Sequence, residues 1–191
     1  MLIYKISITE LKKLIILSII MFTGIIKYIS EINKNDNIIT LELNEQLFEG
    51  QYICINGCCL QVSDVNKNNY SFIISPEIEK TSCFKQICNI ELFDCLIDSG
   101  DIIENEYNIT GNIDTIGLIK NKTETELEII FDSKYYNLLL GKNRVAIDGV
   151  SLVINKLYDY YFTVNIDNYI INNTIIKFYI IGDIINIEFY N

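Results

Sequence analysis

Two stretches of sequence decide how this chain folds: NGCCLQV at residues 56–62 and DGVSLVI at residues 148–154. Each begins with a polar residue and a glycine, and each places a small side chain, Cys59 or Ser151, directly before a leucine. Glycine lets the backbone turn tightly or approach a ligand closely. Since side chains alternate along a strand, we expect Cys59 and Gln61 on one face and their apolar neighbours on the other.

Further matches recur in the same order in the two halves of the chain. They are Thr23-Gly24 with Thr110-Gly111, Phe72 with Phe162, Thr81-Ser82 with Asn173-Thr174, and Asn89-Ile90-Glu91 with Asn186-Ile187-Glu188. Ordered self-similarity indicates duplication of one structural unit. We therefore predict an N-terminal module over residues 21–104 and a C-terminal module over residues 105–191.

Runs of β-branched and aromatic residues, separated by turn residues, predict strands throughout. These runs are 37–43, 52–55, 59–65, 70–75, 124–131, 144–147, 151–157, 161–166 and 183–189. Short helices are expected at 76–83 and at 133–140, the second capped by Ser133 and ended by Gly141. The predicted fold is all-β, with two tandem six-stranded antiparallel β-barrels and short helices.

Composition excludes several classes of function. The chain has 191 residues, a net charge of −10 and no histidine. A nucleic-acid partner is not expected, because binding phosphates needs a basic surface. The absence of histidine removes Ser-His-Asp and Cys-His catalysis and every metal site that needs histidine. Half of the residues are hydrophobic, which argues against disorder.

The six cysteines allow two interpretations. An even number is compatible with disulfides in a secreted protein. A chain of this length and apolar content does not need such bridges, and no C-x-x-C pair suggests zinc, so we expect reduced thiols and a cytoplasmic location. Cys59 could be a small buried hydrophobe, as most free cysteines are. The serine at the matching position, Ser151, instead indicates that both positions require a small side chain that can be polar.

The first twenty residues differ from the rest. Lys5, Lys12 and Lys13 precede an apolar run at 14–26, which is shorter than the ~20 residues of a membrane helix. No small-residue cleavage site follows it, so a signal peptide is less favoured. We expect translation to start at Met21, with residues 1–20 as an upstream extension, and we expect no membrane association.

The opening MFTGII at residues 21–26, followed by NGCCL at 56–60 and DGVSL at 148–152, resembles the riboflavin synthase family in order and spacing. The resemblance covers residues 21–191 and implies two similar barrels in tandem. It also implies the family reaction, in which one 6,7-dimethyl-8-ribityllumazine transfers a four-carbon unit to another. The products are riboflavin and 5-amino-6-ribitylaminouracil, and no metal or other cofactor is used.

The same resemblance implies one ligand site in each barrel, with Cys59 as the residue involved in the chemistry. For the first site it implies Phe22, Thr23, Gly24, Ile25, Ile26, Leu60, Gln61, Ile73, Ile74, Ser75, Pro76, Glu77 and Ile78. Gly111, Asn112 and Ile113 complete that site or bridge to the second. For the second site it implies Lys142, Ser151, Leu152, Val153, Asn165, Ile166, Asp167, Asn168, Tyr169 and Ile170.

The sequence departs from the family pattern at several positions. Two family histidines are missing around 105–107 and 111–112, and Gln61 and Val153 stand where the family has threonine. Family enzymes are homotrimers held together by a C-terminal helix, which is not found after the last predicted strand, so trimerisation stays open. A non-catalytic lumazine- or flavin-binding protein of the same fold is the alternative function, and a decayed copy without a ligand is a third.

Overall fold

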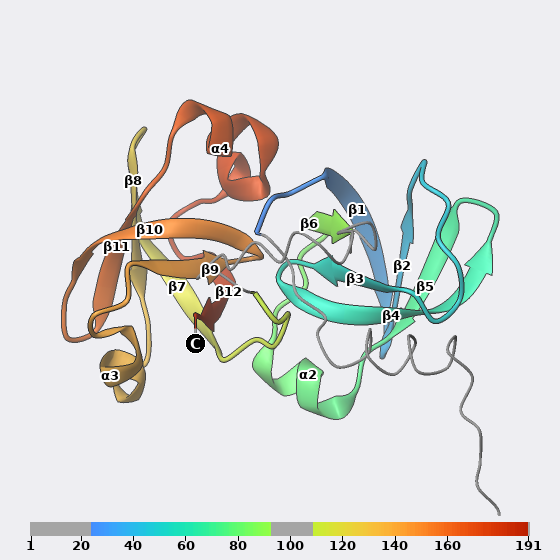
Figure 1. Ribbon diagram of the computed structural model, residues 1–191, viewed down its shortest axis with the longest axis horizontal. Coiled ribbons are helices and arrows are strands. Elements are labelled where there is room, and N and C mark those ends of the chain that lie inside the picture. The colour runs from blue at the N-terminus through green and yellow to red at the C-terminus, as the bar shows by residue number, and fades with distance from the viewer. Residues whose placement is uncertain (1–23, 93–108, 191) are drawn as a thin grey trace, which may run out of the picture.

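The computed structural model describes residues 24–92 and 109–190 and contains two closed barrels side by side (Figure 1). The N-terminal barrel consists of β1 (Tyr28–Asn35), β2 (Ile38–Glu42), β3 (Tyr52–Ile55), β4 (Cys58–Asn66), β5 (Asn69–Ile73) and β6 (Ile87–Leu92), with helix α2 (Pro76–Thr81) between β5 and β6. All of its strand pairs are antiparallel, in the order β1-β2-β5-β4-β3-β6.

The C-terminal barrel repeats this plan. It consists of β7 (Thr115–Lys122), β8 (Glu126–Ile130), β9 (Arg144–Ile147), β10 (Val150–Leu157), β11 (Tyr161–Asn165) and β12 (Ile184–Phe189), with the short helices η1 (Ser133–Tyr135), α3 (Tyr136–Leu139), α4 (Asn168–Asn173) and η2 (Ile175–Phe178). Its strand order is that of the first barrel, position for position. The predicted fold, two tandem six-stranded barrels, is therefore confirmed.

Alternation along β4 and β10 builds the two cores. Cys58, Leu60 and Val62 point into the N-terminal barrel and are buried, whereas Cys59 and Gln61 face outward. In β10, Val150 and Leu152 are buried in the second core in the same way. Each barrel encloses its own apolar cluster, so the interior of each barrel is filled by side chains.

Two-residue hairpin turns connect β3 to β4 and β9 to β10. Asn56 and Gly57 have φ values of 48° and 80°, and Asp148 and Gly149 have 45° and 81°. Positive φ at both turn positions matches the right-handed twist of the strands and explains why Asn-Gly and Asp-Gly occur here. The turns also meet between the barrels: a Cβ on Gly57 would lie 2.7 Å from the nitrogen of Gly149.

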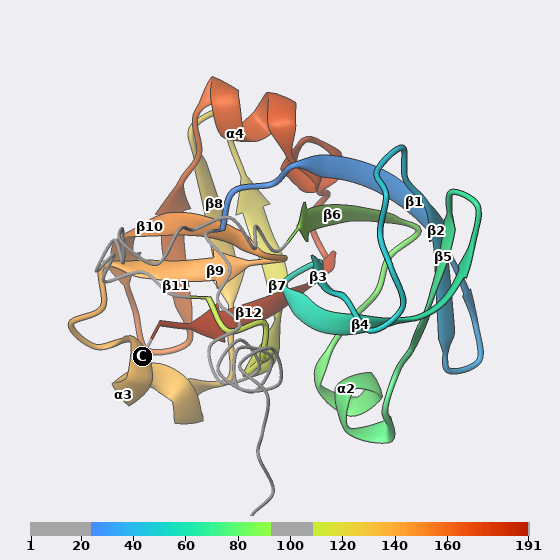
Figure 2. The ribbon, with the colours of Figure 1, turned by 45° about the vertical axis from the view of Figure 1, so that its right-hand side comes forward.

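Four buried polar side chains tie the barrels together around this contact. Asn56 Oδ1 accepts from the nitrogen of Asn89 at 2.7 Å, and Asp148 Oδ1 accepts from the nitrogen of Asn186 at 2.8 Å. Asn89 Nδ2 then donates to the Asp148 carbonyl at 3.0 Å, and Asn186 Nδ2 donates to the Asn56 carbonyl at 3.0 Å. These bonds are reciprocal, so the two modules are joined through matching positions. Figure 2 shows the two barrels side by side.

The interface is asymmetric at one position, because Asp148 stands where the first copy has Asn56. The Asp148 carboxyl also accepts from the Tyr179 hydroxyl at 2.6 Å. Burial raises the pKa of Asp148 to about 6, against the opposing effect of the Tyr179 hydrogen bond. Lys85 from the first module lies 4.5 Å from the Tyr179 ring centroid and 3.3 Å from Asp183, adding a further contact between modules.

Several expectations need correction. The second predicted helix begins as η1, and its cap is Asp132 rather than Ser133, since Lys134 N donates to the Asp132 carboxylate. Strand pairing shows that Phe162 corresponds to Tyr70 and not to Phe72. Phe162 pairs with Leu157 of β10, and Tyr70 pairs with Val65 at the matching position of β4. The sequence did not predict β1, β6, β7 or α4 as regular elements.

The predicted extension at 1–20, the start at Met21 and the module boundary at 104/105 lie outside the described residues. Within residues 24–92 and 109–190, no helix has the length and apolar character that crossing a membrane requires. The five described cysteines, which are Cys54, Cys58, Cys59, Cys83 and Cys88, are all free thiols.

Replacement of Gly149 by alanine tests the contact between the turns. Gly149→Ala combines left-handed backbone strain with a Cβ only 2.8 Å from the nitrogen of Gly57. We expect it to lower the free energy of unfolding by about 3 kcal/mol. Gly141 is the matched control: its φ is +80° but nothing lies within 4 Å of its added Cβ, so Gly141→Ala should cost only about 1 kcal/mol. Equal losses in urea unfolding would contradict a close turn contact.

Candidate functional site

The outer face of β4 forms one wall of a candidate site. Cys59 is half-buried and Gln61 is exposed, and the neighbouring strand β5 ends at Ile73, shortly before Ser75, which caps α2. Gly111 closes this wall from outside the barrel. The nitrogen of Cys59 donates to the Gly111 carbonyl at 2.8 Å. A Cβ on Gly111 would lie 2.5 Å from the Cβ of Cys59, so only glycine fits there.

The outer face of β10 forms an equivalent second wall. Ser151 is half-buried and Val153 is exposed. Gly24 occupies the place that Gly111 has on the first wall. The nitrogen of Ser151 donates to the Gly24 carbonyl at 3.3 Å, and a Cβ on Gly24 would lie 2.6 Å from that of Ser151. The two walls therefore have the same construction, with serine in place of cysteine.

The segments that close the walls cross between the modules. Gly24 precedes the first barrel but contacts Ser151 of the second, and Ile26 packs against the second core. Ile113, which precedes the second barrel, packs against the first core. The expected grouping of Gly24 and Ile26 with Cys59 was therefore wrong, because these residues lie at the second wall. Gly111 and Ile113 lie at the first wall.

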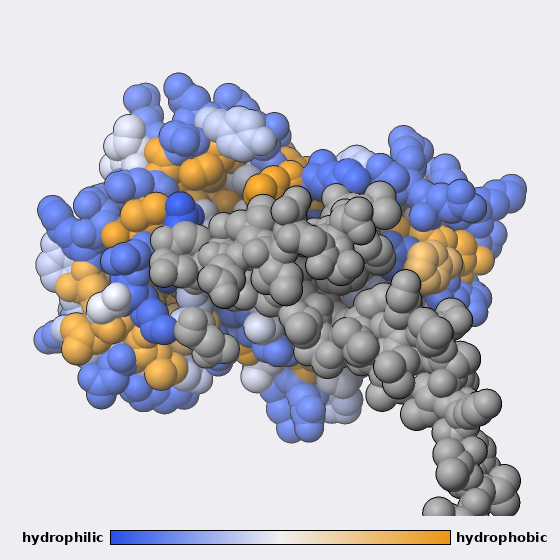
Figure 3. Space-filling model, in the orientation of Figure 1, coloured by the Kyte–Doolittle hydropathy of each residue, from blue (hydrophilic) through white to orange (hydrophobic). Residues whose placement is uncertain are grey.

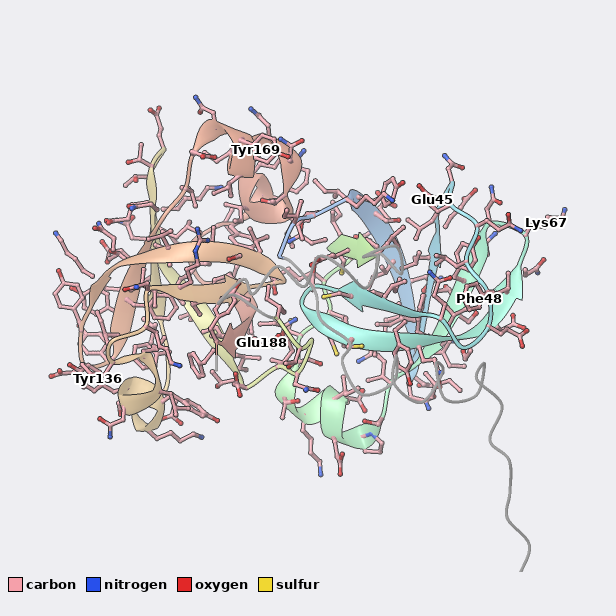
Figure 4. The ribbon with its side chains drawn as sticks, in the orientation of Figure 1. Glu45, Phe48, Lys67, Tyr136, Tyr169 and Glu188 are labelled. Carbon is pink, nitrogen blue, oxygen red and sulfur yellow. The ribbon has the colours of Figure 1, made fainter. Side chains whose placement is uncertain are left out.

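A buried glutamate fixes each crossing segment. Glu188 of β12 accepts hydrogen bonds from the Thr110 nitrogen at 2.6 Å, the Thr110 hydroxyl at 2.8 Å and the Gly111 nitrogen at 3.1 Å. Glu91 of β6 accepts from the Gly24 nitrogen at 3.2 Å through both oxygens. Figure 4 shows Glu188 between the two barrels. Sequence reasoning assigned these glutamates no role, although the recurring Asn-Ile-Glu marked them.

Burial determines the charge state of the first wall. It raises the pKa of Glu188 to about 7, although hydrogen bonds from Thr110 and Gly111 oppose the shift. Burial, followed by the charge of Glu188, raises the pKa of the Cys59 thiol to about 12. Cys59 is thus a protonated thiol near neutral pH and cannot act there as a thiolate nucleophile.

The second wall carries a cation. Arg144 lies on β9 beside β10, and its Nη1 donates to the Ser151 hydroxyl at 3.0 Å. Ser151 and Arg144 also act on the nearby Tyr190, where they oppose the rise in pKa that burial causes. Neither Arg144 nor Tyr190 was among the expected site residues, since nothing in the repeated motif marks them.

The other expected residues fall into distinct environments. The side chains of Leu60, Ile74, Leu152 and Ile166 are buried in the barrel cores, so a ligand could reach only their backbone. Ser75 and Asp167 cap α2 and α4 by accepting from Ile78 and Ile170 nitrogens. The following residues lie on the surface or half-exposed: Ile25, Ile73, Pro76, Glu77, Ile78, Asn112, Lys142, Asn165, Asn168, Tyr169 and Ile170. Phe22 and Thr23 lie outside the described residues.

Tyr169 projects from α4 at the edge of the second barrel, where Figure 3 shows apolar surface among polar residues (Figure 4). Close to this helix lies a wide, mainly apolar hollow of about 620 Å³, lined by Lys122, Thr123, Glu124, Ile171, Tyr179, Ile180 and Ile181. None of the expected site residues lines it. In residues 24–92 and 109–190, no three His, Cys, Asp or Glu side chains gather as metal ligands.

Comparison with known proteins agrees with this arrangement. The family model for the lumazine binding domain matches residues 110–189. The riboflavin synthase of Buchnera aphidicola subsp. Schizaphis graminum is 31% identical and covers 88% of each chain. The yellow fluorescent protein of Aliivibrio fischeri is 28% identical and covers 90% of this chain and 96% of that protein. The crystal structure of LumP complexed with 6,7-dimethyl-8-(1'-D-ribityl) lumazine aligns with a TM-score of 0.72 at 22% identity, over 90% of this chain and 100% of that one.

The tandem six-stranded barrels and the match to the lumazine binding domain place the chain in the lumazine-binding class of proteins. Within that class, the chain belongs to the riboflavin synthase family, as a diverged member.

The raised pKa of Glu188 predicts a pH dependence of stability. A carboxyl whose folded pKa exceeds its unfolded value binds more protons when folded, so stability falls as pH rises between the two values. Glu188 has a folded pKa of about 7. The free energy of unfolding should therefore fall by about 1 kcal/mol from pH 6 to pH 8 because of this group.

Glu188→Gln should remove that slope in urea unfolding series at pH 6, 7 and 8. Most of the Asp148 contribution, with its pKa of about 6, falls below this window and stays in the variant. An unchanged slope above pH 6 in Glu188→Gln would show that Glu188 is already charged there.

Proposed function

We propose that this chain is a riboflavin synthase that converts two molecules of 6,7-dimethyl-8-ribityllumazine into riboflavin and 5-amino-6-ribitylaminouracil. The observation that carries the proposal is the duplicated wall. Cys59 with Gly111, and Ser151 with Gly24, present the same backbone arrangement twice. A reaction between two copies of one substrate needs two similar binding surfaces, and the similarity of the two walls supports the proposal.

Positioning is the main catalytic device in this proposal. Holding two bound reactants in a fixed orientation makes their reaction effectively unimolecular, which lowers the barrier considerably. The walls suit this task because Glu91 and Glu188 hold the segments that close them through buried hydrogen bonds. Glu188 is buried and already accepts three hydrogen bonds, so we assign it to positioning of Gly111.

Cys59 is the residue that we assign to the chemistry. Because burial keeps its thiol protonated, the thiol can donate a hydrogen bond to charge that develops on the bound ring, but it does not attack as a thiolate. The sequence contains no histidine, so the step that removes a ring-methyl proton uses another base.

A non-catalytic lumazine- or flavin-binding role is the second candidate. It is favoured by the similarity to the yellow fluorescent protein of Aliivibrio fischeri and to crystal structures of LumP complexed with 6,7-dimethyl-8-(1'-D-ribityl) lumazine, riboflavin and flavin mononucleotide. The absence of histidine also fits a protein that binds without turnover. We further propose a cytoplasmic location, supported by the free thiols of the described cysteines.

Mixing the purified chain with 6,7-dimethyl-8-ribityllumazine separates the two functions. Riboflavin synthase activity predicts riboflavin, which is followed by absorbance, together with one equivalent of 5-amino-6-ribitylaminouracil. Saturable binding without riboflavin would assign the chain to the non-catalytic role. Light scattering in the same buffer gives the number of chains in the active species and tests the homotrimer.

Replacement of Cys59 tests its part in the reaction. Cys59→Ala should lower kcat about 100-fold, because the donor at the wall is lost. Cys59→Ser should keep most of the activity, since serine occupies the matching position at Ser151. Cys83→Ala is the control for loss of a half-buried thiol that is not on either wall. A kcat equal to wild type in Cys59→Ala would remove Cys59 from the chemistry.

A further inference from the structure

The two walls have the same backbone but different charge. Position 52 on β3 and position 144 on β9 correspond, because Tyr52 pairs with Gln61 and Arg144 pairs with Val153. The first wall therefore places a tyrosine beside Cys59, where the second places an arginine beside Ser151. The two surfaces share their backbone arrangement but differ by a full positive charge at this matching position.

Arg144 is held in place at the second wall. Its Nη1 lies 3.0 Å from the Ser151 hydroxyl, and both side chains are half-buried. Burial raises the pKa of Tyr190 to about 12, while Ser151 and the charge of Arg144 act in the opposite direction. The charges of Glu188 and Glu91 also raise the pKa of Tyr190. The Arg144 guanidinium and the Ser151 hydroxyl thus form a hydrogen-bonded pair beside Gly24.

The identity of the cation is informative. Lysine supplies all other basic residues of the chain, and Arg144 is the only arginine in the sequence. A guanidinium presents a planar fork of donors that matches two oxygens of an anion, which a lysine ammonium does not. Lys142, two residues earlier and half-exposed, adds a second positive charge near this wall in a chain of net charge −10.

We propose that Arg144 is a specificity-determining residue of the second wall, where it binds an anionic oxygen of the ligand. This inference rests on the proposed function, in which each barrel binds one ligand molecule. It assigns the molecule that carries the negative charge to the second barrel. One chemistry has two possible sources: a phosphate at the end of the ribityl chain, as in flavin mononucleotide, or a ring oxygen of lumazine after a ring methyl has lost its proton.

Ligand titrations on the full chain distinguish these sources. The variants are Arg144→Gln, which removes the charge, and Arg144→Lys, which keeps it without the fork. Tyr52→Gln places the same amide at the matching position of the first wall, and Lys156→Gln removes a charge from an exposed position of β10. Riboflavin and flavin mononucleotide are titrated by fluorescence, and bound 6,7-dimethyl-8-ribityllumazine is titrated with base by absorbance.

If a phosphate is the anion, Arg144→Gln should weaken flavin mononucleotide binding about tenfold or more and change riboflavin binding less than about twofold. If the ring is the anion, Arg144→Gln should leave the ratio of the two flavin affinities unchanged. It should then raise the pH at which bound lumazine loses its proton by about one unit. Either result supports the proposal, and neither control variant should reproduce it.

The proposal is overturned if Arg144→Gln leaves both measurements unchanged. It is also overturned if Arg144→Gln weakens the binding of all ligands equally and Arg144→Lys weakens it just as much. The proposed function fails separately. If wild type binds lumazine but forms no riboflavin, the inference about Arg144 can still hold. If wild type forms riboflavin and Arg144→Gln changes neither measurement, only the inference is lost.

Discussion

The contact between Gly57 and Gly149 is the constraint on which the rest of the structure depends. Each hairpin turn needs positive φ, and each also needs the absence of a side chain so that the other turn can approach to backbone distance. That approach brings Asn89 within reach of Asp148 and Asn186 within reach of Asn56, which satisfies polar groups that burial would otherwise leave without partners. Two separate apolar cores are thereby joined by a polar, geometrically specific interface.

The crossing segments connect this interface to the candidate sites. Gly111 bonds at once to Glu188 of its own module and to Cys59 of the other, and Gly24 does the same with Glu91 and Ser151. A change in how the barrels meet would therefore move the outer edge of both walls. The same burial that makes this connection rigid also raises the pKa values of Glu188 and Cys59, so the positions of these groups and their charge states have a common cause.

Local chemistry made much of the fold predictable. Asn-Gly, Asp-Gly and the apolar alternation of β4 and β10 are sufficient to indicate hairpins and a duplicated module. The sequence analysis did not predict β6, because Asn89 and Glu91 are residue types that usually lie at the surface. In the structure both are buried and bonded to residues far along the chain, Asn89 to Asp148 and Glu91 to Gly24. β7 contains Gly117, which fits because Ile187 packs where a Cβ would be. The crossing of Gly24 to the second wall is a contact between distant parts of the chain, and no local pattern encodes it.

Reciprocal exchange at the walls also bears on how such a protein can arise. A single module that paired with an identical copy around a twofold axis would complete two identical walls through the same exchange of segments. Joining two modules in one chain keeps that geometry but frees each copy to mutate alone. The substitutions of Cys59 by Ser151 and of Asn56 by Asp148 show that this freedom has been used. Duplication within the chain thus permits division of labour between two walls that a symmetric dimer would hold identical.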